Sequence, residues 1–435
     1  MNTVIESYTG TAGFMREELS KTMITKFTDL YEASRQEEQK ARYEKIRAGF
    51  AELFGEKDVT FISAPGRTEV GGNHTDHQHG CVLAAAVDLD IVAAAAPNGE
   101  QVMRLKSAEY PKMDEIDLTD LSVHEEEKES SAALLRGVCA RCRELGYRVE
   151  GFDAYTMTQV LKGSGLSSSA AFEVVVVHAI SHLFNNDAID AVTAAQISQY
   201  AENVYFGKPS GLMDQTASSV GGFTAIDFAD PSEPKFKKVD FNLAAHGYAL
   251  CIVDTGGNHA DLTGDYASIP VEMKQVANEL GVDFLRDADE SAFYARLGEI
   301  RKKTGDRAVL RAMHFFDDNR LAQDEANALA EGNLDAFLEM EIRSGRSSFM
   351  RLQNVFACSN PSEQGLSLAL ALSEKLLAGK KASWRVHGGG FAGTVQAFVP
   401  VEELSHYKTE MEKVFGEGTC HVLSVRRAGG TRVDF

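Results

Sequence analysis

The sequence predicts an α+β fold in two lobes, built from mixed sheets and helices. Strand-like apolar runs alternate irregularly with long helix-like runs in both halves of the chain. The chain has 435 residues, of which 44% are hydrophobic, and this is long enough for two separate cores. Two prolines and a run of charges in "DFADPSEPKFKK", residues 227–238, indicate a boundary. We therefore expect an N-terminal extension over residues 1–26 and two domains over residues 27–230 and 231–435.

The first half is predicted to begin with a surface helix, because charged residues and periodic apolar residues alternate from Asp29 to Phe54. The next run, "VTFISAPGR", is typical of a strand that ends in a Pro-Gly turn. Farther along, a Gly/Ser loop opens onto an almost wholly apolar and therefore buried helix, "AAFEVVVVHAISHLF". The other elements expected here are one or two buried strands over 82–96, a helix over 132–145, a strand over 152–161 and a helix over 195–206.

The second half repeats the mixed pattern without an internal repeat. It is predicted to hold a strand over 248–256, helices through 267–345, a helix over 364–378, and strands that flank a glycine loop over 384–400.

Composition excludes several classes of protein. The net charge of −20 argues against nucleic acid and anionic membranes, because polyanion-binding proteins usually carry a basic excess. The six cysteines are scattered, which in a chain of this size indicates free thiols and a reducing compartment. No apolar run reaches the roughly 20 residues of a membrane helix, and the first residues lack a signal-peptide pattern. We expect a cytoplasmic protein without an obligate protein partner.

The loop "GSGLSSSAA", residues 163–171, has the properties of a phosphate cradle. Its glycines allow close approach of the backbone, its serines add hydroxyl groups, and the helix that follows directs N–H groups at an anion. It is not a Walker A loop, because no Gly-Lys-Ser/Thr follows. A serine-rich helix cap is an equally good interpretation of this loop by itself.

Two further loops carry candidate functional groups. "HGGGFAG", residues 387–393, lies between strand-like runs, where three glycines indicate close approach to a ligand or another loop. "SGLMDQ", residues 210–215, places Asp214 among small and apolar neighbours, where it is a candidate general base or a helix N-cap. Two glycine-rich loops, one in each half, favour a nucleotide cleft between the lobes.

The stretch "APGRTEVGGNHTDHQHG", residues 64–80, is the densest in chemically active side chains. Its crowded histidines and Asp76 resemble zinc-hydrolase ligand sets, so a metal hydrolase is one hypothesis. No further ligand cluster follows downstream, however. A polyhydroxyl ligand such as a sugar also requires many short polar side chains at close range.

Taken in order, "APGR", "HTDH", "GSGLSSSAA", "SGLMDQ" and "GGGFAG" resemble the GHMP family of small-molecule kinases, and galactokinases within it. Residues 66–77 resemble the galactokinase signature Gly-Arg-x-Asn-Leu-Ile-Gly-Glu-His-Thr-Asp-Tyr, with changes. The resemblance extends from about residue 27 to the C-terminus. It implies the two-lobed GHMP kinase fold, an active site in the cleft between the lobes, and transfer of phosphate from ATP to the anomeric hydroxyl of galactose.

The resemblance also implies roles for individual residues. Arg67 would lie near the sugar C1 hydroxyl and the γ-phosphate, and Asp214 would take the proton from that hydroxyl. Mg²⁺ would bind Ser169 and Glu202, which offer the hard oxygen ligands that it prefers. ATP would lie on the loop formed by Gly163, Ser164, Gly165, Leu166, Ser167, Ser168, Ser169 and Ala170. The sugar would contact Glu69, Asn73, His74, Asp76, Gly211 and Tyr266.

The sequence departs from the galactokinase pattern at three places. Glu69 stands where the family has Asn, and Asn73 stands where it has the Glu that contacts the sugar around O6. The segment 131–138 lacks the Trp that often stacks on adenine, and the only tryptophan is Trp384. His387 replaces a Thr before the glycines. The exchange at 69 and 73 leaves two interpretations open: both groups remain in the pocket, or the preference at C6 has changed.

Three alternatives to a galactose kinase follow. A kinase for galacturonate or N-acetylgalactosamine fits the exchange at 69 and 73. A sensor that binds galactose and ATP without turnover is disfavoured, because "GLSSSAA", Arg67 and Asp214 are all intact. A zinc hydrolase is disfavoured by the resemblance itself.

Overall fold

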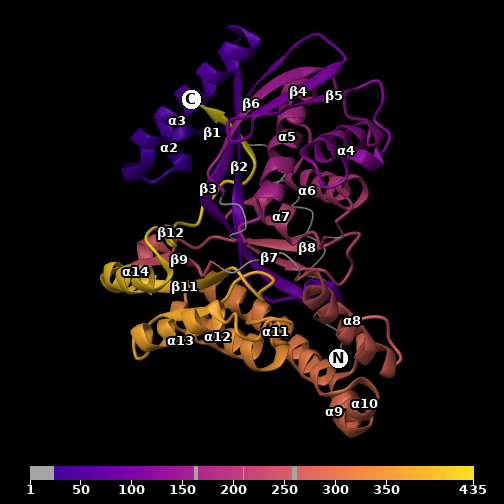
Figure 1. Ribbon diagram of the computed structural model, residues 1–435, viewed down its shortest axis with the longest axis vertical. Helices are drawn as coiled ribbons and strands as arrows, with labels where there is room; N and C mark the ends of the chain where they lie inside the picture. Colours follow the sequence, from indigo (N-terminus) through magenta and orange to yellow (C-terminus); the bar gives the residue numbers. More distant parts are fainter. Residues whose placement is uncertain (1–23, 161–164, 209, 257–261) are drawn as a thin grey trace, which may run out of the picture.

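The structure of the protein is a computed structural model that describes residues 24–160, 165–208, 210–256 and 262–435. The predicted α+β class is confirmed, since helices pack on two sheets (Figure 1). No helix in these ranges is both long enough and apolar enough to cross a bilayer. The expected extension over residues 1–26 lies mostly outside the described residues.

The larger sheet is built around two long antiparallel strands, β2 and β3. Residues 82–96, predicted as one or two strands, belong to the single strand β3. In the described part of the chain the sheet order is β1 (Thr25–Lys26), β13 (Thr431–Asp434), β2 (Thr60–Gly71), β3 (Cys81–Pro97), β6 (Phe152–Thr158), β4 (Val102–Ser107) and β5 (Met113–Asp117), with β7 (Phe223–Asp227) and β8 (Lys235–Val239) paired beyond β3.

Helices cover both faces of this sheet, which is why β2 and β3 are buried along almost their whole length. α3 (Gln36–Phe54) packs Tyr43, Ile46 and Phe50 on one face, against Phe61. The next residue, Ile62, faces the other layer, as the two-residue period of a strand requires. That layer contains α4 (Ser131–Glu144), α5 (Ser168–Asn185), α6 (Ala191–Tyr200) and α7 (Met213–Val220) (Figure 1).

The helices of this second layer agree with the sequence prediction except at their ends. α6 begins at Ala191 rather than near 195, because Asp190 caps it by accepting hydrogen bonds from the N–H groups of Val192 and Thr193. It continues as a π-helix over Ala201–Phe206. On α4, Cys139 and Cys142 are buried free thiols.

The smaller sheet has the order β10 (Ser383–Val386), β11 (Thr394–Pro400), β9 (Tyr248–Asp254) and β12 (Cys420–Leu423), with every pair antiparallel. α13 (Gly365–Leu377) and α14 (Val401–Phe415) share a core with it. In Figure 1, α11 (Asp306–Ala330) and α12 (Leu334–Ser347) lie beside α13 under this sheet, and α8 (Thr263–Glu279), α9 (Glu290–Ala295) and α10 (Leu297–Thr304) extend from the lower lobe to one side.

The two halves of the sequence interleave in space. β8 and β13 both follow residue 230, yet they belong to the larger sheet with the N-terminal strands. The segment 227–238, expected as a boundary, includes the turn of the β7–β8 hairpin. The C-terminal strand β13 lies between β1 and β2, so the end of the chain completes the N-terminal sheet.

Candidate active site

An arginine–aspartate pair joins two segments far apart in the sequence. Arg67 lies on β2, and Asp214 lies in the first turn of α7. Arg67 Nε donates to Asp214 Oδ1 over 2.7 Å, and its Nη2 is also 2.7 Å from that oxygen. Arg67 Nη1 donates to the carbonyl of Gly165 in the Gly/Ser loop. The Arg67 guanidinium on β2 therefore contacts both the candidate base, Asp214, and the Gly/Ser loop, which is the candidate phosphate site.

The Asp214 carboxylate is held in its ionised form. Burial by itself would raise its pKa, but the charge of Arg67 and the hydrogen bonds from Arg67 and Ser167 outweigh burial and lower it. Ser167 Oγ donates to Asp214 Oδ2 over 2.6 Å, so each carboxylate oxygen has a donor. Its side chain is still 24% exposed, which leaves it accessible to a ligand.

The described part of the Gly/Ser loop wraps around the start of α5. Gly165 and Ser167 have positive φ angles of 73° and 55°, so the backbone turns sharply before the helix begins at Ser168. The carbonyl of Leu166 accepts a hydrogen bond from the N–H of Arg67 over 2.9 Å. Ala170 is buried in the next turn. Gly163 and Ser164 lie outside the described residues.

The loop after β10 reaches the Gly/Ser loop. A Cβ on Gly165 would lie only 3.0 Å from Nδ1 of His387, so the two loops touch. His387 itself is buried, and its Nδ1 lies 2.8 Å from Oγ1 of Thr394. The sequence left this histidine without a role, and the structure places it between the two glycine-rich loops.

A buried carboxylate lies beside the Gly/Ser loop. Glu202, in the π-helix that extends α6, is 2% exposed. Its Oε1 accepts hydrogen bonds from Ser169 Oγ over 3.1 Å and from Lys208 Nζ over 3.0 Å. Its Oε2 accepts a hydrogen bond from Gln215 Nε2 over 2.8 Å. Ser169 and Glu202 thus meet as the resemblance implies, and Lys208 and Gln215 join them.

The polar loop that follows β2 forms the opposite side of the site. His74 has a φ of 60°, and its Nε2 lies 2.9 Å from the carbonyl of Gly389. Burial and the neighbouring His77 lower the pKa of His74 to about 4, so its ring is neutral. Because a carbonyl only accepts, Nε2 carries the proton, and Nδ1 is left as an acceptor.

The remaining predicted sugar contacts lie around this loop. A Cβ on Gly211 would come within 2.5 Å of Asp76 Oδ2, so only glycine allows this approach of "SGLMDQ" to the carboxylate. Tyr266, on α8, donates from its hydroxyl to the carbonyl of Gly390 over 2.9 Å. Its ring lies against Gly389. The four predicted loops therefore converge in one place.

The exchanged residues Glu69 and Asn73 form a direct hydrogen bond, from Asn73 Nδ2 to Glu69 Oε1 over 2.6 Å. The Asn73 amide also donates to the carbonyl of Gly388, and its oxygen accepts from Ser348 and Asn354. Asn73 is 0% exposed, so its side chain is fully used by the protein.

Glu69 lies on β2 itself, whereas Asn73 lies in the loop that follows this strand. It is two residues from Arg67 in a regular part of β2, so both side chains lie on the same face of the strand. Burial raises the pKa of Glu69 to about 7, although Arg385, Arg67 and the bond from Asn73 act in the opposite direction. Its Oε1 accepts hydrogen bonds from Asn73 Nδ2 and from Arg385 Nη2, and the latter atom is 3.4 Å away.

The clustered histidines do not form a metal centre. His79 stacks on Phe284 with ring centroids 3.6 Å apart, away from His74. Across the described ranges, no three His, Cys, Asp or Glu side chains converge in a way that would hold a metal ion. The arrangement gives no support to the zinc hypothesis.

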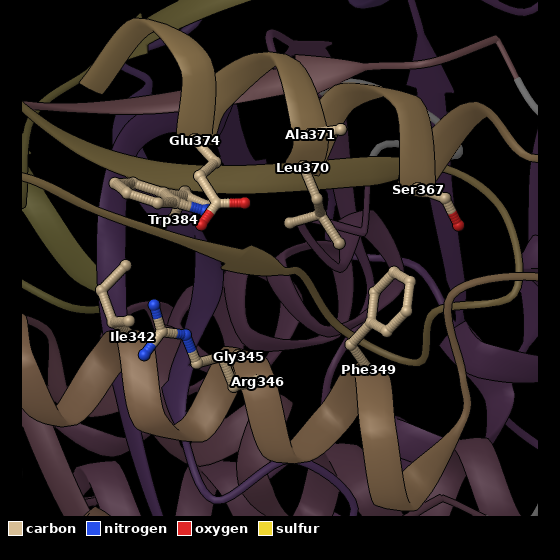
Figure 2. A pocket seen from close by; sticks show the side chains of 9 residues that line it. All are labelled: Ile342, Gly345, Arg346, Phe349, Ser367, Leu370, Ala371, Glu374 and Trp384. Carbon is tan, nitrogen blue, oxygen red and sulfur yellow. The ribbon is translucent and has the colours of Figure 1, made fainter. Parts of the chain in front are cut away.

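The only tryptophan is directed away from these loops. Figure 2 shows Trp384 with Ile342, Phe349 and Leu370 around a surface pocket between α12 and α13. The pocket has a volume of about 280 Å³. On the same strand Arg385 points to the other side, where its Nη1 donates to the carbonyl of Val70. Trp384 is therefore not the adenine-stacking residue that segment 131–138 lacks.

Three residues of the site were missed by sequence reasoning. Gln215 follows Asp214 directly and could have been noticed, and Lys208 lies two residues before "SGLMDQ". Arg385 gave no signal, because a single arginine in a strand-like run looks like a surface residue.

Comparisons with known proteins agree with the geometry. The chain matches the family models "Galactokinase galactose-binding signature" over residues 48–97 and "GHMP kinases N terminal domain" over residues 133–222. It is 31% identical to the galactokinase of Streptomyces coelicolor over 368 residues, which cover 84% of this chain and 91% of that protein. It is 28% identical to the galactokinase of Actinobacillus pleuropneumoniae over 363 residues, 82% of this chain and 90% of that one.

Solved structures support the same fold. Lactococcus lactis galactokinase complexed with galactose superimposes with a TM-score of 0.77 at 24% identity, covering 90% of this chain and all of that one. Methanococcus jannaschii mevalonate kinase superimposes with a TM-score of 0.60 at 15% identity, covering 85% and 99%. The predicted two-lobed GHMP fold is thereby confirmed. With the identity and coverage of the Streptomyces relative, the chain belongs to the galactokinase family of GHMP kinases.

Proposed function

We propose that the protein phosphorylates the anomeric hydroxyl of D-galactose with ATP, giving galactose 1-phosphate and ADP. The observation that carries this proposal is the Arg67–Asp214 pair, in which Arg67 on β2 contacts both the candidate base on α7 and the Gly/Ser loop. The relatives named galactokinase, and the solved galactokinase that holds galactose, support the choice of sugar.

In the proposed reaction, Asp214 accepts the proton of the C1 hydroxyl. The hydroxyl oxygen bonds to the γ-phosphorus while the bond from that phosphorus to the bridging oxygen of ADP breaks. Arg67 balances the negative charge on the transferred group, and its planar cation is always protonated. Ser167 and Arg67 hold the Asp214 carboxylate ionised and oriented, so the base is ready before the substrate binds.

The donor set at Ser169 and Glu202 suits Mg²⁺. A hydroxyl and a carboxylate oxygen lie 3.1 Å apart, and the same carboxylate already attracts a cation, the Lys208 ammonium. Mg²⁺ usually takes one or two protein carboxylates and completes its ligands with phosphate oxygens and water. Ser169 and Glu202 would hold it, and it would neutralise charge on the ATP phosphates when bound.

The proposed sugar contacts are His74, Asp76, Gly211, Tyr266 and Glu69. Asn73 is assigned a supporting role, because its amide is saturated by four protein partners. Glu69 shares a strand face with Arg67 and would supply the carboxylate near C6 that the family takes from the other position. In its ionised form Glu69 would repel a uronate, which favours galactose over galacturonate.

Release of ADP tests the proposal, measured with galactose, galacturonate and N-acetylgalactosamine in the presence of ATP and Mg²⁺. We expect the highest kcat/KM with galactose. Turnover of galacturonate alone would move the assignment to a uronate kinase, and galactose binding without ADP release would identify a sensor. We also propose a cytoplasmic location, which the scattered free cysteines support.

A further inference from the structure

Lys208 contacts the carboxylate proposed to hold the metal, at the oxygen that also faces Ser169. Its Nζ donates to Glu202 Oε1 over 3.0 Å, and Ser169 Oγ donates to the same oxygen over 3.1 Å. The ammonium therefore occupies a position on the ligand oxygen that a bound cation would take.

The backbone keeps Lys208 next to this carboxylate. The N–H groups of Gly207 and Lys208 both donate to the carbonyl of Glu202, over 3.0 and 3.1 Å. Gly207, with a φ of 88°, reverses the chain directly after the π-helix. The main chain thus holds the base of the lysine side chain in place, while its four-carbon stem remains flexible.

The exposure of the two partners differs sharply. The Glu202 side chain is 2% exposed, whereas that of Lys208 is 58% exposed. The lysine therefore reaches the buried carboxylate from the solvent side. A buried carboxylate without a cation is costly, and Lys208 supplies the opposite charge.

Two cations cannot share one carboxylate oxygen at close range without strong repulsion. We propose that Lys208 is a movable cation of the phosphoryl-transfer site, bound to Glu202 in the nucleotide-free protein and released to the phosphates when a metal–nucleotide complex binds. This inference rests on the proposed kinase function. It adds a second protein cation to Arg67.

The surroundings of Lys208 fit this transfer. Glu202, which binds the ammonium, also accepts a hydrogen bond from Gln215, the residue next to Asp214, and the charge of Lys208 helps to lower the pKa of Asp214. A lysine is a compact point charge with three donors, which suits a non-directional contact with phosphate oxygens. Arg67, by contrast, is fixed by Asp214 and Gly165 and has little freedom to move.

The variants Lys208→Met and Lys208→Arg test the inference, with Lys381→Met as the matched control. Lys381 pairs with Asp335 on the surface, with its side chain 72% exposed. The kcat of Lys208→Met should fall about 10- to 100-fold, the usual value of a hydrogen bond to a charged group, and Lys208→Arg should recover part of it. Lys381→Met should retain wild-type kcat.

A second measurement is independent of turnover. Calorimetry gives the Kd of ADP with and without Mg²⁺, and the ratio of the two values reports how strongly Mg²⁺ aids nucleotide binding. ADP lacks the γ-phosphate to which Lys208 would move, so the effect of Lys208→Met on this ratio comes from Glu202, which has lost its cation in the metal-free state. Mg²⁺ should therefore aid ADP binding about fivefold more in Lys208→Met than in the wild type. Lys381→Met should keep the wild-type ratio.

Either of two results would overturn the inference: a kcat of Lys208→Met within twofold of the wild type, or a Mg²⁺ ratio that is unchanged or smaller. Failure of the proposed function is a separate outcome. In that case the wild type releases no ADP with any sugar, while the calorimetric ratio still reports on Lys208 and Glu202.

Discussion

Carboxyl groups at the two ends of the active site differ in how many cations lie beside them. At the phosphoryl-transfer end, Asp214 pairs with Arg67 and Glu202 pairs with Lys208, while the buried Glu173 beside Glu202 has no cation in ion-pair contact among the described residues. Near the polar loop that follows β2, four buried carboxyl groups surround the single guanidinium of Arg385 in the described structure: Glu69, Asp318, Glu325 and Glu341.

The ionisation of the two groups follows from this difference. The pKa of Asp214 lies below its usual value, whereas burial raises the pKa of Glu341 to about 8 and that of Glu325 well above its usual value. Within the described residues, neither oxygen of Glu325 or Glu341 has a hydrogen-bond partner. Buried carboxyl groups without partners take up protons. A buried carboxyl group is therefore ionised where a cation pairs with it, as at Asp214, and neutral where its oxygens have no partner, as at Glu325 and Glu341.

The largest expected effect comes from removing the negative charge of Asp214. Asp214→Asn keeps the shape of the side chain but removes the proton acceptor, so kcat should fall by about 100- to 10,000-fold. Binding of galactose, measured by calorimetry, should stay within a few fold of the wild type. Full turnover by Asp214→Asn would remove Asp214 from its proposed role.

A smaller effect is expected from adding a side-chain atom next to the neutral Glu325. Gly71 closes β2 directly against Glu325, and a Cβ at this position would overlap the Glu325 Oε2 atom. Gly71→Ala should lower the free energy of unfolding by about 1–3 kcal/mol, as overpacking usually does. Chemical denaturation measures this value.

The control for Gly71→Ala is Gly298→Ala on α10, where a new Cβ would meet no atom within 4 Å. It should be neutral or slightly stabilising, because alanine is the better helix former. Equal stability of the two variants would show that the Glu325 side chain moves away from the new Cβ without lowering the free energy of unfolding.

The smallest expected effect is a change in how stability depends on pH. The pKa of Glu341 rises from 4.5 in the unfolded chain to about 8 in the folded protein. The folded state thus binds the extra proton, and the stability from this group is complete below pH 4.5 and is lost as the pH rises towards 8.

Glu341→Gln imitates the protonated form and cannot ionise. It should raise the free energy of unfolding at pH 8 by on the order of 1 kcal/mol and reduce its decline between pH 5 and pH 8. Denaturation at several pH values measures both. A decline as steep as that of the wild type would place the responsible proton on another group, with Glu325 the next to test.

Local sequence determined the elements that carry the site. The apolar run 170–184 became α5, and the Gly/Ser loop leads directly into a helix start. The run that begins "VTFIS" became β2, but the predicted turn at Pro65 and Gly66 was wrong: the strand continues to Gly71, with an irregularity in its pairing with β3 between Pro65 and Arg67. These features depend on hydrophobic period, turn residues and helix capping, which act over a few residues. The order of the loops then identified the family, and with it the candidate residues Arg67 and Asp214.

Only the tertiary structure decided how the candidate residues are partnered. The Asn73 oxygen accepts hydrogen bonds from Ser348 and Asn354, which follow it by 275 and 281 residues. Lys208 reaches Glu202 because Gly207 turns the chain back after the π-helix. Glu325 and Glu341 lie on helices whose charged residues look exposed in sequence, yet both are 0% exposed. Burial and partnership depend on contacts across the whole fold, and these contacts determine whether a carboxyl group is a base, a ligand or a neutral packing group.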